Sequence, residues 1–194
     1  KECKESGIKP LFTVWDTEKA QWCLDEGLDS IKLASFHIAD RDLLEFIASK
    51  FKTVFLSTGM STLQDIENAV EVLKVENLYL LHCVSDYPLK VEDVNLKVMN
   101  SLRKYTKYIG YSDHTIGTTA VLAAVSLGAD VIEKHFTISK DLPGTDHIFS
   151  ATPEELKYIV EETGKIELLL GTAEKVMTTL EKKNQAFLRM RFRH

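Results

Sequence analysis

Short apolar runs alternate with longer amphipathic segments along most of this chain. The runs are rich in Val, Ile, Leu and Phe, which is typical of strands buried on both faces. Most runs lead into a segment of helical periodicity that opens on a capping residue or closes on a glycine. This alternation predicts a parallel sheet with helical crossovers. The predicted strands are residues 11–15, 30–34, 53–56, 78–83, 108–111 and 131–134.

Two helix starts follow a capping-box pattern. Thr152-Pro153-Glu154-Glu155 has Pro at the first helical position and predicts a helix to about Leu170. Ser61 and Gln64 give a similar pattern and predict a helix to about Lys74. The other predicted helices run from Asp16 or Thr17 to Gly27, from Arg41 to Lys50, from Leu96 to Lys104 and from about Thr118 to Leu127. Asp40 is the predicted cap of the second of these. Residues 1–9 are predicted as the tail of a helix, and residues 172–194 as a helix or tail.

Two α/β architectures fit this alternation, a doubly wound open sheet and a (β/α)8 TIM barrel. An open sheet places ligands mainly at one switch point, whereas a barrel gathers all its strand ends around one mouth. Polar residues follow almost every predicted strand, which favours the barrel. A closed barrel takes eight units and about 250 residues. Since we find about six units, we expect an incomplete TIM barrel that lacks the two N-terminal units.

Composition narrows the class of protein. The 194 residues are 44% hydrophobic, enough for one substantial core. The net charge is −5 and no basic stripe indicates nucleic acid. No apolar run approaches the roughly 20 residues of a membrane span, and no signal peptide is evident. Cys3, Cys23 and Cys83 lack CxxC spacing, so we expect idle thiols in a reducing cytoplasm.

The strongest chemical signal lies between Gly110 and Asp146. His114 and His135 stand at the ends of two successive predicted strands, which lie side by side in a parallel sheet. Two imidazoles with water and substrate oxygens suit a divalent metal; the alternative is a pair of hydrogen-bonded core histidines. Asp113 either orients an imidazole or satisfies a backbone amide. The remaining histidines, His37, His82 and His147, are expected to be structural.

Further polar groups offer an anion site. Ser57-Thr58-Gly59 joins a strand to a capped helix, where hydroxyls and backbone N–H groups suit phosphate; ordinary capping is the alternative. Lys32 lies inside an apolar strand and either faces an anionic partner in a barrel interior or lies on an outward edge. Glu133 and Lys134 are expected to pair with each other, with no chemical role.

Six stretches together resemble the sialic acid synthase family, which comprises N-acetylneuraminate synthase and the related legionaminic and pseudaminic acid synthases. They occur in the family's order and at its spacing, between about residues 11 and 171. The combination is specific, although each piece alone is weak. The stretches are Ile31-Lys32-Leu33-Ala34-Ser35, Leu56-Ser57-Thr58-Gly59-Met60, Leu81-His82-Cys83-Val84-Ser85-Asp86-Tyr87-Pro88, Gly110-Tyr111-Ser112-Asp113-His114-Thr115, Glu133-Lys134-His135-Phe136-Thr137 and Pro143-Gly144-Thr145-Asp146-His147.

The resemblance implies a TIM-barrel transferase that condenses phosphoenolpyruvate with an acetamido-hexose such as N-acetylmannosamine. The product is a nine-carbon, sialic-acid-type 2-keto acid, and phosphate is released. By similarity, His114 and His135 hold a divalent metal, Mn or Mg, and Tyr87 and Asp146 face the amino sugar. Lys32, His114, His135 and Asp146 are thereby the implied catalytic residues. The positions implied to hold phosphoenolpyruvate are Thr13, Lys32, Ser35, Ser57, Ser85 and Ser112.

This sequence also departs from the family pattern. The family's first two strands, with a catalytic Glu and a phosphate-binding Lys, have no counterpart. The likeness fades after Gly171, and the antifreeze-like domain, which lends an Arg to the partner subunit's sugar site in a homodimer, is missing. Trp15 and Asp16 replace the more usual Phe and Ser beside the sugar pocket. We therefore expect a partial synthase domain over 1–171 and a helix or tail over 172–194.

Two rival interpretations stay open. One is a noncatalytic half-barrel remnant that binds phosphate or a partner. The other is a different barrel enzyme that uses phosphoenolpyruvate or a sugar phosphate.

Overall fold

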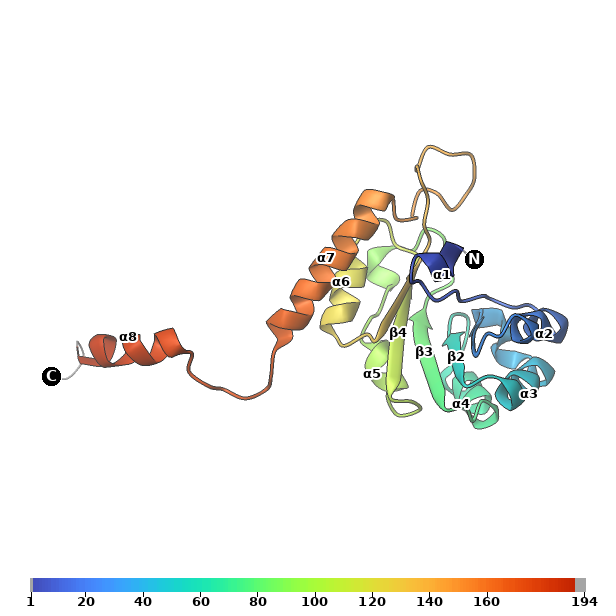
Figure 1. Ribbon diagram of the computed structural model, residues 1–194, viewed down its shortest axis with the longest axis horizontal. Helices are drawn as coiled ribbons and strands as arrows, with labels where there is room; N and C mark the ends of the chain where they lie inside the picture. Colours follow the sequence, from blue (N-terminus) through green and yellow to red (C-terminus); the bar gives the residue numbers. More distant parts are fainter. Residues whose placement is uncertain (1, 191–194) are drawn as a thin grey trace.

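Five parallel strands form one sheet in which the strand order follows the chain order. The computed structural model describes residues 2–190 (Figure 1). The strands are β1 (Ser30–Leu33), β2 (Thr53–Ser57), β3 (Asn77–Cys83), β4 (Tyr108–Asp113) and β5 (Val131–Lys134). A doubly wound sheet reverses its strand order at a switch point. Because this sheet runs straight from β1 to β5, the open-sheet alternative does not describe it.

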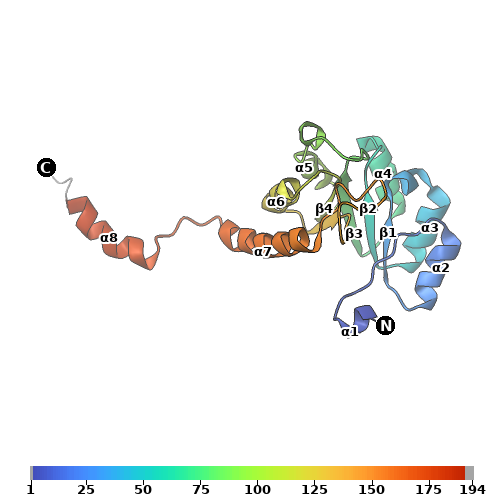
Figure 2. The same ribbon diagram turned by 90° about the horizontal axis from the view of Figure 1, so that it is seen from above.

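The sheet is strongly curled. Its outermost strands would lie roughly 19 Å apart if it were flat, given about 4.8 Å between neighbours. Instead, the Nζ of Lys32 on β1 lies 3.4 Å from a carboxylate oxygen of Glu133 on β5. The helices follow the same curve around the strands (Figure 2). The molecule is therefore a half-barrel, as the distribution of polar strand ends predicts.

Strand alternation divides the side chains between two faces. Those on the outer face pack against the helices and form the main core; Ile31, Leu33, Val54, Leu56 and Leu80 are almost entirely buried there. The inner face carries a stacked aromatic row at its lower end, with ring centroids of Phe55 and Tyr79, and of Tyr79 and Tyr108, 4.5 Å apart. Polar residues occupy the upper end of the same face.

Helices cross over between successive strands. Asp16 caps α2 (Thr17–Asp25) by accepting from the Lys19 amide, and Asp40 caps α3 (Arg41–Lys50) by accepting from the Leu43 amide. The later crossovers are α4 (Leu63–Val72), α5 (Val98–Leu102) and α6 (Thr119–Ser126), with short 3-10 helices η1 (Ser35–Ala39) and η2 (Val91–Asp93). The predicted helix 96–104 is thus shorter than expected.

Two sequence predictions need correction. The capping box before α4 is formed by Thr62 and Asp65, one residue later than predicted, because the Ser61 hydroxyl instead donates to the Gly59 carbonyl. The predicted strand 11–15 makes a single parallel bridge, between Thr13 and Lys32. Within the described chain this segment borders the sheet on one side only, so it has just one partner strand.

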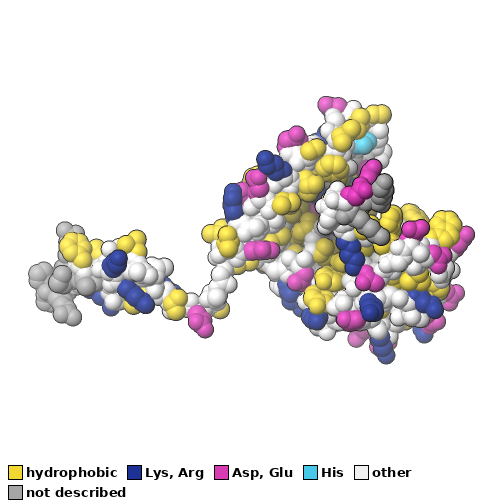
Figure 3. Space-filling view, viewed as in Figure 1, with side chains coloured by type: hydrophobic (Ala, Val, Ile, Leu, Met, Phe, Trp, Pro, Cys, Tyr) yellow, Lys and Arg dark blue, Asp and Glu magenta, His cyan; other side chains and the backbone are white. Residues whose placement is uncertain are grey.

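The C-terminal part of the chain is helical. α7 (Pro153–Leu170) begins with the predicted Thr152–Glu155 capping box and packs on α6, and Gly171 follows it. Figure 3 shows apolar side chains along α7, and Leu168 and Leu169 are among those exposed. α8 (Thr179–Met190) lies away from the sheet (Figure 1).

The N-terminal tail contains α1 (Glu2–Glu5). Lys1 and residues 191–194, which belong to the predicted terminal segments, lie outside the described residues. Among the described residues, none of the helices combines the length and the apolar character that a membrane crossing demands.

Candidate active site

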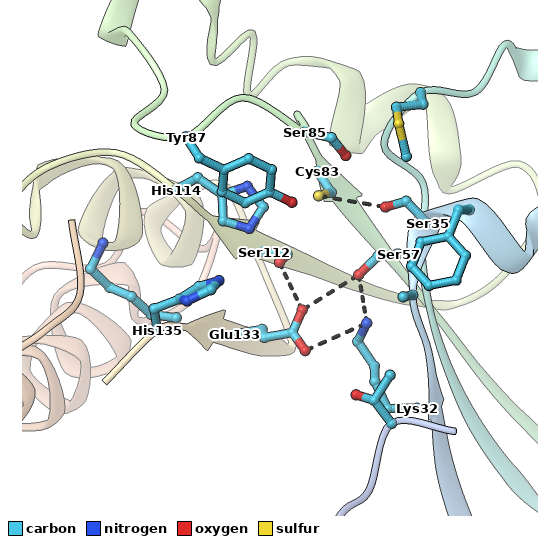
Figure 4. Close-up of a pocket in the computed structure, with 15 residues that line it drawn as sticks. Lys32, Ser35, Ser57, Cys83, Ser85, Tyr87, Ser112, His114, Glu133 and His135 are labelled. Atoms are coloured by element: carbon cyan, nitrogen blue, oxygen red, sulfur yellow. Dashed lines mark hydrogen bonds and ion pairs between the residues drawn. The ribbon is translucent and has the colours of Figure 1, made fainter. Parts of the chain in front are cut away.

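The upper, C-terminal ends of the strands surround a cavity of about 340 Å³. This cavity brings together residues from all five strands and from the loops that follow them (Figure 4). Its lining includes nine of the ten site residues predicted from the sequence. They are Thr13, Lys32, Ser35, Ser57, Ser85, Tyr87, Ser112, His114 and His135.

Asp146 is the tenth predicted residue. It follows β5 on the loop before α7 and is not part of the cavity lining, but its carboxylate lies 3.7 Å from the Nδ1 of His135. It therefore stands at the edge of the site, beside one of the two predicted metal ligands.

Lys32 is the cationic centre of the cavity. Its residue is 5% exposed, and its Nζ donates to the Ser57 hydroxyl at 2.7 Å and to the Leu33 carbonyl at 3.0 Å. Burial lowers the pKa of Lys32 below its ordinary value, and the carboxylate of Glu133 partly offsets this effect. The inward-facing alternative for Lys32 is confirmed, with Glu133 as the anionic partner that such a lysine requires.

The prediction that Glu133 pairs with Lys134 is wrong. Neighbouring residues in a strand point to opposite faces, so the two side chains cannot share one environment. Glu133 faces the cavity and accepts from Ser112 at 2.7 Å as well as pairing with Lys32. Lys134 pairs with Asp113 instead. Glu133 is thus a site residue that the sequence prediction missed, although its position two residues before His135 on a strand places it on the same face.

A second group of hydroxyls lies around Gly59. The Gly59 amide donates to the Ser35 hydroxyl at 2.9 Å, and that hydroxyl lies 3.7 Å from the sulfur of Cys83. A Cβ added at Gly59 would overlap the hydroxyl of Ser85 and lie 2.9 Å from that of Ser35. A side chain at residue 59 would therefore displace the hydroxyls of Ser85 and Ser35, because three strand-end loops converge here. Burial raises the pKa of the Cys83 thiol, so this cavity residue is held as the neutral thiol.

The two predicted metal ligands stand on the opposite side of the cavity from Lys32 (Figure 4). The ring centroids of His114 and His135 are 5.5 Å apart, and the ring of Tyr87 packs on His114 at 4.3 Å. Nδ1 of His114 lies 2.8 Å from the carbonyl oxygen of Val84 and donates to it when that nitrogen carries the proton. Burial lowers the pKa of His114, which favours the neutral imidazole.

These two histidines fit a metal site with an incomplete protein ligand set. In His114, a hydrogen bond from Nδ1 to the Val84 carbonyl leaves the lone pair of Nε2 available to a metal ion, which is the usual arrangement of a metal-bound histidine. Among residues 2–190 no group of three or more His, Cys, Asp or Glu side chains is arranged to hold an ion. An ion held by these two histidines would take its other ligands from outside them, and water or substrate oxygens are suitable donors.

The remaining candidates have structural surroundings. Asp113 accepts from the backbone amide of Thr115 at 3.0 Å, so of its two predicted roles the structure supports the backbone one. His82 is buried with Nε2 2.7 Å from the Val94 carbonyl, and Nδ1 of His147 lies 2.8 Å from the Thr137 hydroxyl. His37 is buried beside Phe36, and its Nε2 has no hydrogen-bond partner within residues 2–190.

Trp15 and Asp16, the two residues that differ from the family's usual Phe and Ser, have different surroundings. The ring of Trp15 lies 4.9 Å from that of Phe36, which lines the cavity, so Trp15 extends the apolar rim. Asp16 caps α2.

Comparisons with known proteins point to one family. Residues 1–175 match the model of the NeuB family. The chain is 42% identical over 187 residues to the N,N'-diacetyllegionaminic acid synthase of Campylobacter jejuni, covering 93% of this chain and 56% of that protein. It is 40% identical over 177 residues to the enzyme of the same name from Legionella pneumophila, covering 87% of this chain and 50% of the relative.

A solved structure is also similar. The crystal structure of N-acetylneuraminic acid synthetase from Leptospira borgpetersenii superposes with a TM-score of 0.87 at 34% identity, covering 98% of this chain and 68% of that one. The chain spans about half the length of the curated relatives it matches. The family match takes in the half-barrel and every residue of the cavity lining, and on this ground the chain belongs to the NeuB family.

Proposed function

We propose that this chain forms part of an enzyme that condenses phosphoenolpyruvate with an N-acetylated amino sugar. The product is a nine-carbon 2-keto acid of the sialic acid type, and phosphate is the second product. The observation that carries the proposal is one cavity with two chemically different sides. A buried lysine with several hydroxyls forms one side, and two histidines beside a tyrosine form the other.

The lysine side suits the two anionic groups of phosphoenolpyruvate. Lys32 supplies a buried positive charge, and the Gly59 amide and the hydroxyls of Ser57, Ser35 and Ser112 supply hydrogen-bond donors. Donors fixed in this way act in a partly desolvated site, where their interactions with charge are stronger than in water. Thr13 and Ser85 complete this side of the cavity.

Glu133 balances the charge of Lys32 while no anion is bound. When phosphoenolpyruvate binds, its phosphate or carboxylate competes with Glu133 for Lys32. The released carboxylate then stands inside the cavity as a base. We assign it the acceptance of a proton from the water that adds at C2 of phosphoenolpyruvate, because Glu133 is the carboxylate that lines the cavity and is 40% exposed at its side chain.

The histidine side suits the aldehyde end of the open-chain sugar. His114 and His135 would hold a divalent ion, Mn or Mg, and such an ion supplies Lewis-acid polarisation of the aldehyde oxygen. Tyr87 packs on His114 and Asp146 borders His135, so both are placed to contact the sugar. C3 of phosphoenolpyruvate then forms a bond to the aldehyde carbon, water adds at C2, and the adduct expels phosphate.

The proposal extends to the architecture. We place residues 1–171 in an eight-stranded barrel of which this half-barrel is a part, with 172–194 as a separate segment. The remaining strands come from the rest of the protein, in keeping with relatives about twice as long. We also propose a homodimer for the whole protein.

Phosphate release from phosphoenolpyruvate by the protein at its natural length tests the function. Release should require both an acetamido-hexose and a divalent ion. His114→Ala should lower the rate on the order of a hundredfold or more, since metal polarisation contributes several kcal/mol. His82→Gln, which alters a buried histidine outside the cavity, is the control and should stay close to wild type.

The alternatives give different results in the same assay. Release without a sugar or without metal would instead indicate another phosphoenolpyruvate-using barrel. Absence of any release, with phosphate binding retained, would support the noncatalytic remnant.

A further inference from the structure

A buried ion pair lies directly behind the two histidines of the cavity. Nζ of Lys134 is 2.5 Å from Oδ2 of Asp113, and the side chains are 6% and 0% exposed. Asp113 belongs to β4 and Lys134 to β5, and the two residues are register partners at the end of that strand pair. The pair is thus the last cross-strand contact before the strands separate into loops.

The hydrogen-bonding capacity of this pair is largely used. Oδ1 of Asp113 accepts from the Tyr111 hydroxyl at 2.9 Å and from the Thr115 amide at 3.0 Å. Nζ of Lys134 also donates to the Thr115 carbonyl at 2.9 Å. Both charged groups are therefore held in one geometry by several contacts at once.

Such a pair is a poor choice for stability alone. Removing two charges from water costs about as much as their attraction returns, and apolar residues of similar size often stabilise a fold equally well. The best-supported benefit of a buried pair is that it fixes position and register. The position fixed here is that of the β4 and β5 ends relative to each other.

His114 and His135 are the next residues along the two strands. Since β4 ends at Asp113 and β5 at Lys134, no ladder pairing joins the two histidines themselves. The ring of His114 is oriented independently, through the Val84 carbonyl. The separation between the two rings, 5.5 Å between centroids, therefore depends on how the strand ends are held together.

We propose that Asp113 and Lys134 are positioning residues that set the separation of His114 and His135. The inference rests on the proposed function for its chemical consequence, which is the ability of the two imidazoles to share one divalent ion. Lys134 is one of the residues that line the cavity, but its Nζ is engaged by Asp113 and by the Thr115 carbonyl, so the pair acts through the histidines.

The double variant Asp113→Asn/Lys134→Met tests this. It removes both charges together, so no unpaired charge stays buried, and Asn keeps an acceptor for Tyr111 and Thr115. Crystal structures of wild type and variant should show the ring separation changed. Affinity for Co²⁺, followed by its visible absorption, should fall about tenfold to a hundredfold. The kcat should fall while the KM for phosphoenolpyruvate, which is held by Lys32, stays within about twofold of wild type.

A control and a second variant complete the design. Arg41→Gln/Glu45→Gln removes an exposed ion pair on α3 and should change none of these readouts. Asp113→Glu keeps the charge but lengthens the side chain, so it should alter the geometry of the pair and weaken Co²⁺ binding. A folded double variant with wild-type ring separation and Co²⁺ affinity overturns the inference, and if the double variant does not fold, wild-type Co²⁺ affinity in Asp113→Glu overturns it.

The two proposals fail separately. Wild-type protein that neither binds Co²⁺ nor releases phosphate contradicts the proposed function. The ring separation in the variant structures still decides whether the pair positions the histidines.

Discussion

Lys32 and Glu133 meet at 3.4 Å although one lies on the first strand of the sheet and the other on the last. Two strands between them contribute serines to this contact: Ser57 accepts from Lys32, and Ser112 donates to Glu133. The charged pair and the two serines thereby connect the inner face across β1, β2, β4 and β5. It also couples the anion-binding side of the cavity to the one carboxylate among its lining residues.

Replacing this carboxylate should separate binding from turnover. In Glu133→Gln the competition for Lys32 disappears, so phosphoenolpyruvate should bind as tightly as in wild type or more tightly. Loss of the base should lower kcat by about 10²- to 10⁴-fold. Isothermal titration calorimetry and phosphate release measure the two effects. Glu71→Gln, an exposed residue of α4, is the control, and a wild-type kcat in Glu133→Gln would contradict the assignment.

Gly59→Ala should damage the anion-binding side specifically. The added Cβ would overlap the Ser85 hydroxyl and press on that of Ser35, so we expect phosphoenolpyruvate affinity to fall at least tenfold and stability to fall by roughly 1–3 kcal/mol. Gly164→Ala is the matched control, because a Cβ there meets nothing in α7 and should stabilise by roughly 0.5–1 kcal/mol. Urea unfolding and calorimetry would show whether the two glycines differ in this way.

The position of the α4 cap can be tested by unfolding measurements. Thr62→Ala removes the side chain that accepts from the Asp65 amide and should cost about 1 kcal/mol. Gln64→Ala should stay within about 0.5 kcal/mol of wild type, because Gln64 lies on the exposed face and its side chain donates to the exposed Asn68. The opposite ranking would support the predicted Ser61–Gln64 box.

Buried histidines should make the fold sensitive to mild acid. Burial lowers the pKa of both His37 and His82 below the ordinary value of 6.5, so the folded protein binds these protons less readily than the unfolded chain. Their contribution to stability is therefore present above pH 6.5 and is lost as the pH falls through the lowered values.

Unfolding free energies at pH 7.5 and pH 5.5 check this directly. The protein should be less stable at the lower pH, and His82→Gln should reduce the difference. An unchanged pH dependence in that variant would show that His82 titrates alike in both states.

The alternation of apolar runs and capped helices was sufficient to predict a parallel sheet with helical crossovers, because both features are local properties of sequence. The choice of a barrel over an open sheet needed a further observation, the polar residues that follow almost every strand. The structure of residues 11–15 was harder to predict from the sequence. Their apolar pattern favours a strand, but the number of hydrogen bonds that a strand makes depends on neighbouring strands that are distant in the sequence. Ser61 and Thr62 show the same limit on a smaller scale. Both can cap a helix, and the Gly59 carbonyl decides between them by accepting from Ser61.

The site residues were predicted largely through the family motifs. The sequence prediction missed Glu133 as a cavity residue and the pairing of Lys134 with Asp113, and both follow from which face of the strand each side chain occupies. Reading Glu133 and Lys134 as a pair treated sequence neighbours as spatial neighbours. Strand alternation instead gives Glu133 to the cavity and Lys134 to Asp113. The curl that brings β1 to β5 is a property of the whole sheet, so no single motif predicts the contact with Lys32.

The strand order of the sheet has a consequence for synthesis. Among the described residues, each strand pairs with the strand made just before it and the one made just after it, and β1 also bridges the preceding segment at Thr13. A growing chain can therefore add one β-strand and its crossover helix at a time, and each addition can pair at once with a finished edge. Register partners on neighbouring strands are 21 to 29 residues apart, so each pairing closes over a single crossover. The Lys32–Glu133 contact is the exception, since it forms only after the last of the five strands has been made.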